Sequence, residues 1–149
     1  MTKLLIALLL MAVCVSIHAV GLAVALGWVR QRAGSDVARS AGRVIASLIG
    51  IAAWAILLHI AQILIWAVAY VAFDAMPDMA AATYFSAVTY TTTGYGDLVL
   101  PAGWRVLGGV EALTGILMCG LSTGLFFALF AKVIEVGDST RQAARGGRR

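Results

Sequence analysis

The sequence predicts an all-α membrane protein with three spanning helices and one shorter helix that enters the membrane without crossing it. Of the 149 residues, 62% are hydrophobic and only 12% are charged, which leaves too little polar surface for a soluble domain. Three segments also exceed the roughly 20 apolar residues that cross a bilayer. These segments are Leu4–Val29, Val44–Phe73 and Val106–Ala131.

The charged residues are distributed unequally between the two sides of the predicted membrane. By the positive-inside rule, loops rich in Lys and Arg lie in the cytoplasm. The acidic residues Asp74, Asp78 and Asp97 fall in the opposite loop. We therefore expect a multi-pass protein of the cell membrane with its N-terminus outside and its C-terminus in the cytoplasm. The net charge of +4 is explained by this topology, so no nucleic-acid partner is expected. The basic residues are Arg30, Arg32, Arg39 and Arg43 after the first segment, and Lys132, Arg141, Arg145, Arg148 and Arg149 after the third.

The first element, residues 1–30, is predicted to be an uncleaved N-terminal transmembrane helix. A cleaved signal peptide is the alternative, because Lys3 precedes the apolar run, but the run is longer than a signal sequence needs and the positive charges follow it. The helix lacks the regular arginine spacing of a voltage sensor. Ser16 and His18 are expected to contact other helices, and residues 31–43 to form a cytoplasmic linker.

The second element, Val44–Phe73, would be about 45 Å long as a helix, which exceeds the ~30 Å hydrocarbon core. It should therefore tilt or project beyond one face of the membrane. His59 and Gln62 are three residues apart and share one helical face. We expect that face to pack against protein, because polar groups that face lipid are costly.

The third element begins after Pro77, where Asp78 is a good N-cap. Met79–Thr91 would form a helix of roughly 20 Å, too short to span the membrane. This length suits a re-entrant helix that enters from outside and stops near the midplane. Irregular backbone at that depth must be buried in protein or line a water-filled cavity.

The stretch Thr91–Asp97 follows this short helix. Gly94 and Gly96 take positive φ at little cost, so the backbone can alternate in hand and aim successive carbonyls one way. Such oxygens can replace the water shell of a cation, and the hydroxyl of Thr92 can add a further ring of ligands. Thr92–Asp97 resembles the selectivity filter of the potassium-channel pore-loop family, with Thr93 where Val or Ile is usual. The resemblance extends from about Ile60 to about Lys132 and includes Leu98, Pro101 and Arg105.

The resemblance implies that residues 44–133 form an ion-channel pore domain with an outer helix, a pore helix, a filter and an inner helix. It also implies a homotetramer surrounded by membrane lipids, because each chain offers one filter strand to a shared tetrameric pore. Thr92, Thr93, Gly94 and Tyr95 are expected to supply the oxygens that coordinate K⁺, and Gly96 to shape the outer mouth. The resemblance implies K⁺ as the permeant ion, and no cofactor is expected.

Four residues are expected to support the filter. Tyr84 and Phe85 stand where the family has aromatic residues, and Asp97 directly follows the filter. Val88 occupies a place where some members have a bracing Glu. We expect Glu111 to take over this role by hydrogen bonding to Thr89, Tyr90 or filter amides; the alternative is that it reaches the outer interface.

The third span carries the expected cavity and gate. Ala112, Ile116, Cys119 and Thr123 follow the 4-3-4 spacing of one helical face, which would line a cavity, and Phe127 would extend this stripe as a hydrophobic constriction. By resemblance, Gly115 lies near the hinge glycine of the inner helix, with close helix packing as the alternative. Residues 134–149 are predicted to be a basic cytoplasmic tail that is disordered or lies along the inner leaflet.

No enzyme is expected, because the sequence has no nucleophile paired with a base, no phosphate-binding loop and no metal-ligand cluster. Cys14 and Cys119 are interpreted as small buried hydrophobic residues. The function predicted is that of a potassium-selective channel. One alternative is a weakly selective cation channel, because Thr93 changes the packing behind the filter. Another is a non-conducting membrane subunit that regulates a larger partner; conversely, an unknown regulatory subunit could act on this chain.

Overall fold

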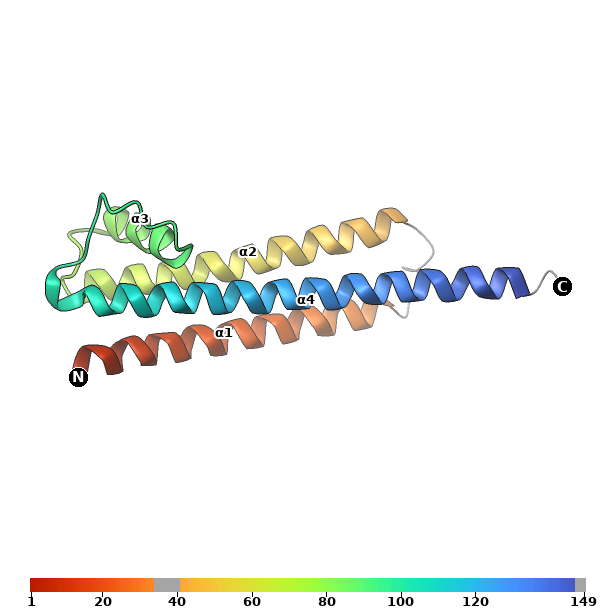
Figure 1. Cartoon of the computed structure of the whole chain (residues 1–149), viewed down its shortest axis with the longest axis horizontal. Coiled ribbons are helices and arrows are strands. Elements are labelled where there is room, and N and C mark those ends of the chain that lie inside the picture. Colours follow the sequence, from red (N-terminus) through yellow and green to blue (C-terminus); the bar gives the residue numbers. More distant parts are fainter. Residues whose placement is uncertain (34–40, 147–149) are drawn as a thin grey trace.

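A computed structural model of the chain contains three long helices packed side by side, with a short helix on one side of one end (Figure 1). It describes residues 1–33 and 41–146, with the side chains of residues 1–31, 42 and 44–131. The described part is helical and has no β-strand, so the all-α prediction is confirmed. The elements are α1 (Thr2–Ala33), α2 (Ala41–Ala72), α3 (Met79–Tyr90), the 3₁₀ turn η2 (Ala102–Trp104) and α4 (Arg105–Gly146).

Three of the described helices are long and apolar enough to cross a membrane. The candidate spans are Thr2–Gln31, Val44–Ala72 and Ala102–Ala131, close to the segments expected from the sequence. The chain is therefore a multi-pass membrane protein. Large apolar side chains such as Leu5, Leu9 and Ile56 remain exposed on the helices, as expected for surfaces that face lipid or other chains.

The C-terminal part differs from the expectation. Helix α4 runs for 42 residues without a break and ends at Gly146, beyond the ends of α1 and α2 (Figure 1). The expectation that residues 134–149 are disordered is therefore wrong for the part that the structure describes, up to residue 146, and the alternative that they lie along the inner leaflet stays a prediction. At 1.5 Å per residue α4 is about 63 Å long, so its polar C-terminal part projects from the membrane. Of the predicted 31–43 linker, residues 34–40 lie outside the described part of the chain.

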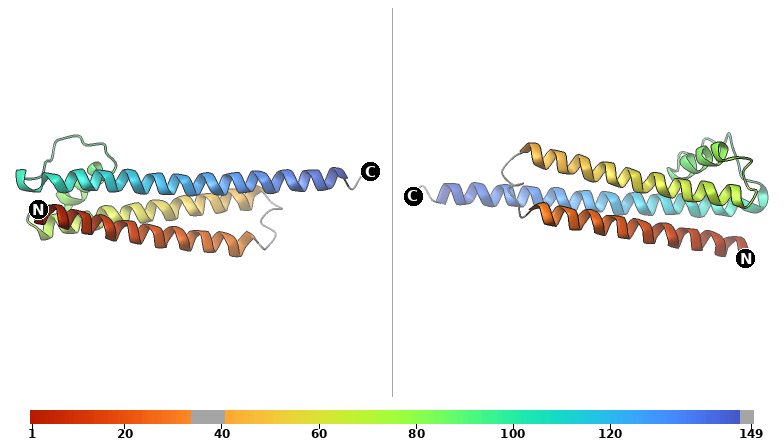
Figure 2. Two further views of the ribbon diagram at one scale, coloured as in Figure 1. Left: turned by 60° about the horizontal axis from the view of Figure 1, so that its bottom comes forward. Right: turned by 180° about the vertical axis from the view of Figure 1, so that it is seen from behind.

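Helix α1 packs against α2 and α4, and α3 packs against the same two helices (Figure 2). A single buried core joins them, because the large apolar side chains of α2, α3 and α4 meet beside the small ones of α1. Its members include Ala7, Cys14, Trp66, Tyr70, Phe85, Tyr90, Leu107 and Met118. The short helix is thus held by the same core as the three long ones.

Three contacts fix the end of the bundle that carries α3. Asp74 takes a positive φ of 52° after α2, a conformation that Asp tolerates better than most residues, and the amide of Ala75 bonds to the Tyr70 carbonyl at 2.8 Å. Nearby, the ring of Trp104 stacks on Phe73 with centroids 5.3 Å apart, and the Nζ of Lys3 lies 4.1 Å from the Trp104 centroid. The beginning of α1 is therefore tied to the end of α2 and to η2.

Candidate functional site

The site is built on the short helix α3. Asp78 caps its N-terminus, as predicted: the backbone is extended there and the carboxylate accepts from the Ala81 amide at 2.8 Å. The helix ends at Tyr90, one residue before the predicted end, with Thr91 as its C-cap. Its buried residues Ala82, Phe85, Ser86 and Tyr90 hold it in the bundle. The loop that follows therefore starts from a fixed point.

The backbone of this loop alternates in hand. Thr92, Gly94 and Gly96 have positive φ values of 59°, 54° and 79°, whereas Thr93 and Tyr95 between them do not. The sequence predicts this for the two glycines but not for Thr92. A β-branched residue in the left-handed region costs about 1–2 kcal/mol, and strain of this kind is commonly stored at functional sites.

The amides of the loop establish where its carbonyls point. The amide of Thr92 donates to the Thr89 carbonyl at 2.9 Å, and that of Gly94 to the Val88 carbonyl at 3.0 Å. In a trans peptide the C=O lies opposite the N–H, and no cis peptide is present in the described chain. The carbonyls of Thr91 and Thr93 therefore point away from α3. Oxygens directed in this way can take the place of water around a cation.

Thr93, which stands where the resembling family has Val or Ile, has a polar partner. Its Oγ1 lies 2.9 Å from the Oγ1 of Thr91, and Thr91 in turn donates to the Ala87 carbonyl at 2.7 Å. The hydroxyl of Thr93 is thus linked through Thr91 to the last turn of α3. The departure from the usual residue type adds a hydrogen bond on the side of the loop that faces the helix.

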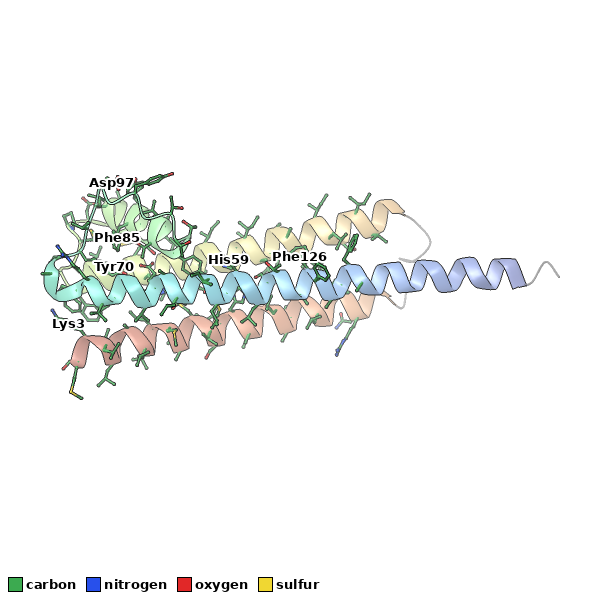
Figure 3. The ribbon with its side chains drawn as sticks, viewed as in Figure 1. Lys3, His59, Tyr70, Phe85, Asp97 and Phe126 are labelled. Atoms are coloured by element: carbon green, nitrogen blue, oxygen red, sulfur yellow. The ribbon has the colours of Figure 1, made fainter. Side chains whose placement is uncertain are left out.

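Tyr84 and Phe85 of α3 have separate partners. The hydroxyl of Tyr84 donates to Asp97 Oδ2 at 2.7 Å. This contact ties α3 to the segment after the loop, on which Figure 3 labels Asp97. This hydrogen bond lowers the pKa of the Asp97 carboxyl from its usual 3.8 and raises the pKa of Tyr84. Phe85 is buried instead and meets the ring of Tyr70 edge-on at 5.2 Å. Tyr84 and Asp97 are therefore brought together as a pair, whereas Phe85 belongs to the core.

Glu111 is completely buried and contacts α2 and α3. Its Oε2 accepts from the Tyr70 hydroxyl at 2.5 Å, and its Oε1 accepts from the Ser86 hydroxyl. The predicted partners Thr89, Tyr90 and the filter amides are wrong, and so is the alternative of an outer-interface position. The inference failed because Ser86, one turn earlier on α3, comes closer to Glu111 than the end of the helix does.

A family model described as an ion channel matches residues 58–132, which is half of the chain. The match begins within α2, includes α3 and the alternating loop, and ends in α4. The chain belongs to this ion-channel family. It is therefore a pore-forming channel, and α1 is an additional helix outside the matched range. Comparisons with curated proteins and with solved structures give no match.

In the channel's inner helix, α4, Gly115 lies against the end of the pore helix, α3. A Cβ built on Gly115 would stand 1.9 Å from the Tyr90 carbonyl oxygen, so no larger residue fits without moving backbone. Helix α4 passes through this position without a break. The close-packing interpretation therefore has direct support, and the hinge role stays a prediction.

The proposed cavity stripe lies on the open side of the channel's inner helix. Ile116, Cys119, Thr123 and Phe127 are exposed on the single chain and Ala112 is half-buried, whereas the other side of the helix is buried. Cavity lining and constriction stay predictions. Of the two cysteines, Cys14 is buried as expected, but the expectation of burial is wrong for Cys119, whose side chain is exposed on the described part of the chain.

The four polar residues singled out in the first two spans contact other helices, with one exception. His59 and Gln62 both bond to the Tyr90 hydroxyl, and His18 bonds to Gln62, as the one-face interpretation predicts. Ser16 donates to the Ala12 carbonyl of its own helix at 2.8 Å, so the expected interhelical contact is wrong. Ser122 was not predicted as a contact residue, although a polar residue in an apolar span is the kind that signals a buried contact.

Proposed function

We propose that the channel is selective for K⁺ and that Thr92, Thr93, Gly94 and Tyr95 supply the coordinating oxygens. The observation that carries this proposal is the alternation of positive and negative φ from Thr92 to Gly96. Together with the amides that face the pore helix, it supports a strand whose carbonyls are directed away from α3, toward a shared axis. Rings of such carbonyls replace the hydration shell of K⁺ in channel filters. Gly96 then shapes the outer mouth.

The filter requires several copies of the chain. One chain offers a single strand, and residues 91–99 are exposed on it. Irregular backbone inside a membrane must be buried in protein or line water, and neither is provided by one chain. A homotetramer supplies the closed ring, with Ala112, Ile116, Cys119 and Thr123 lining the cavity below it and Phe127 forming a constriction.

The orientation follows from charge. Helix α3 and the segments on either side of it, which carry Asp74, Asp78 and Asp97, lie at the same end of the bundle as the N-terminus (Figure 1). The end of α1, which carries Arg30, lies at the opposite end. The positive-inside rule then places the N-terminus outside and the C-terminus in the cytoplasm. Cysteines introduced at Thr2 and Ser35 would react from opposite sides with an impermeant reagent.

One observation favours the second candidate, a weakly selective cation channel. The hydroxyl contact between Thr93 and Thr91 replaces the apolar packing that Val or Ile would give behind the filter. A less rigid filter would also admit Na⁺. The third candidate, a non-conducting subunit that regulates a larger partner, predicts no ion movement by the chain alone.

Ion flux through the purified full chain in liposomes tests the proposal. Vesicles loaded with K⁺ should release it, and vesicles loaded with Na⁺ should not. A Gly94→Ala variant should lose K⁺ flux, because alanine disfavours the positive φ that Gly94 adopts. Nothing lies within 4 Å of the added Cβ within the chain, so the variant tests the backbone conformation and not a steric clash inside the chain. Equal release of both ions would support the weakly selective channel, and no release of either would support the regulatory subunit.

A further inference from the structure

Five side chains, four of them buried and one, His59, half-buried, form a closed ring of hydrogen bonds that contains a member from each of the four described α-helices. They are His18 of α1, His59 and Gln62 of α2, Tyr90 of α3 and Ser122 of α4. His18 and Gln62 are completely buried, and Tyr90 and Ser122 are 2% and 7% exposed. Figure 3 shows His59 between α2 and α4, part-way along the bundle. The contacts are His18 Nε2–Ser122 Oγ at 3.0 Å, Ser122 Oγ–His59 Nε2 at 3.2 Å, His59 Nδ1–Tyr90 Oη at 2.9 Å, Tyr90 Oη–Gln62 Oε1 at 2.8 Å and Gln62 Nε2–His18 Nδ1 at 2.8 Å.

Counting donors gives the direction of every bond. The amide nitrogen of Gln62 only donates, so His18 accepts at Nδ1 and donates from Nε2 to Ser122. Tyr90 donates its only hydroxyl hydrogen to Gln62, so it accepts from His59 Nδ1, and His59 Nε2 accepts from Ser122. Each of the ring nitrogens, oxygens and hydroxyls is then satisfied with both histidines neutral. Removing one member takes one of the two ring hydrogen bonds from each of its neighbours, and a polar group left unsatisfied away from water is costly.

The ring connects directly to the filter through Tyr90. This residue ends the pore helix, its carbonyl lies against Gly115, and the chain enters the filter two residues later at Thr92. The hydroxyl of Tyr90 therefore fixes the inner end of the filter strand to α2, and His18 and Ser122 extend the attachment to α1 and α4. His18 is connected to Tyr90 by two separate hydrogen-bonded paths, one through Gln62 and one through Ser122 and His59.

We propose that His18 is a positioning residue for the filter, and that through it the additional helix α1 holds the filter in its ion-coordinating geometry. That the loop coordinates K⁺ rests on the proposed function, whereas the attachment of the loop to His18 can be tested without any ion. It assigns a role in filter stability to a helix that lies outside the residues matched by the ion-channel family.

Two variants of His18 distinguish the effect of its hydrogen bonds from the effect of its side-chain volume. His18→Leu removes both hydrogen bonds, whereas His18→Gln keeps an oxygen that accepts from Gln62 and an amide that donates to Ser122. Trp54→Phe is the matched control, because Trp54 Nε1 donates to the Gly21 carbonyl of α1 at 2.9 Å and lies outside the ring. It weakens the docking of α1 on α2 without removing a ring member.

Backbone hydrogen exchange in liposomes provides a readout that needs no conduction. The amides of Thr91, Thr92 and Gly94 bond to pore-helix carbonyls, so their exchange reports the attachment of the filter strand. His18→Leu should speed exchange of these amides roughly tenfold, while His18→Gln and Trp54→Phe should match the parent. Current through the same samples should decay faster at low K⁺ for His18→Leu alone.

Three outcomes would overturn the proposal: unchanged exchange in His18→Leu, an equal increase in Trp54→Phe, or failure of His18→Gln to restore the parent value. If His18→Leu does not fold, Ser122→Ala removes one ring hydroxyl with little change in volume. It must also speed exchange of the three amides, and no change would overturn the proposal. A parent protein that conducts no ion would contradict the proposed function and leave the exchange test of the ring intact.

Discussion

The hydroxyl of Ser86 on the pore helix donates to the carboxylate of Glu111 on the inner helix, and both residues are completely buried. Tyr70 of the outer helix donates to the other carboxylate oxygen, so one acidic side chain joins three helices. A charged group at the centre of a membrane costs at least ~2.5 kcal/mol unless it is partnered. Glu111 therefore connects α2, α3 and α4 by hydrogen bonds behind the pore helix.

Two replacements of Glu111 distinguish the effect of its side-chain shape from the effect of its hydrogen bonds. Glu111→Gln keeps an oxygen for Tyr70 and an amide that can donate to Ser86, whose hydroxyl can then donate to the Ile63 carbonyl at 2.8 Å. We expect it to match the parent. Glu111→Leu leaves the Tyr70 hydroxyl without an acceptor, and we expect a loss of about 1–3 kcal/mol in stability. Thermal unfolding of the purified protein measures this loss. Equal midpoints for the Leu and Gln variants would show that the hydrogen bonds of Glu111 do not stabilise the protein.

Gly115 and Gly109 form a matched pair on the inner helix. In Gly115→Ala the new Cβ would meet the Tyr90 carbonyl at 1.9 Å, whereas nothing lies within 4 Å of a Cβ on Gly109. We expect Gly115→Ala to cost about 1–3 kcal/mol through overpacking, and Gly109→Ala to be neutral or stabilising by up to ~1 kcal/mol. Thermal midpoints of both variants check this. A stable Gly115→Ala protein with altered opening would instead support the hinge.

The pair Tyr84–Asp97 gives a defined pH dependence on the outer side. Because the hydrogen bond from Tyr84 lowers the pKa of Asp97, its stabilisation is complete above the usual value of 3.8 and is lost as pH falls through the lower, folded value. Acidification from pH 8 to 5 should therefore leave this contact intact. Tyr84→Phe should raise the Asp97 pKa toward 3.8, which an NMR titration of the carboxyl measures. A pKa of Asp97 that does not respond to this substitution would show that the contact is not formed.

Thr92 should control the inner ion site. Thr92→Ala removes the hydroxyl that is expected to form the innermost ring of ligands, and we expect weaker block by Ba²⁺ with assembly unchanged. Thr92→Ser keeps the hydroxyl and serves as the control. Ba²⁺ block of the current in both variants provides the measurement, and equal block of parent, Ala and Ser variants would place the innermost ligand elsewhere.

The sequence was sufficient for the elements but not for their side-chain partners. Apolar length, the Asp78 cap and the Gly94–Gly96 spacing predict the spans, the pore helix and the loop, because each depends on local chemistry. The partners of Glu111 depend on how far α3 slides along α4, and Gly115 sets that distance through its contact with Tyr90. Likewise, the positive φ of Thr92 arises from the bonds of the loop to α3 and opposes the local preference of a β-branched residue.

The reversal potential of the purified full chain in a planar bilayer tests the central claim most directly. With a tenfold K⁺ gradient balanced by Na⁺ on the opposite side, a K⁺-selective filter predicts a reversal potential near the K⁺ equilibrium value, about 59 mV from zero. Replacement of the remaining K⁺ by Na⁺ on the low-K⁺ side should move the reversal potential further in the same direction. A reversal potential near zero under the tenfold gradient would contradict the assignment of Thr92–Tyr95 as a potassium filter.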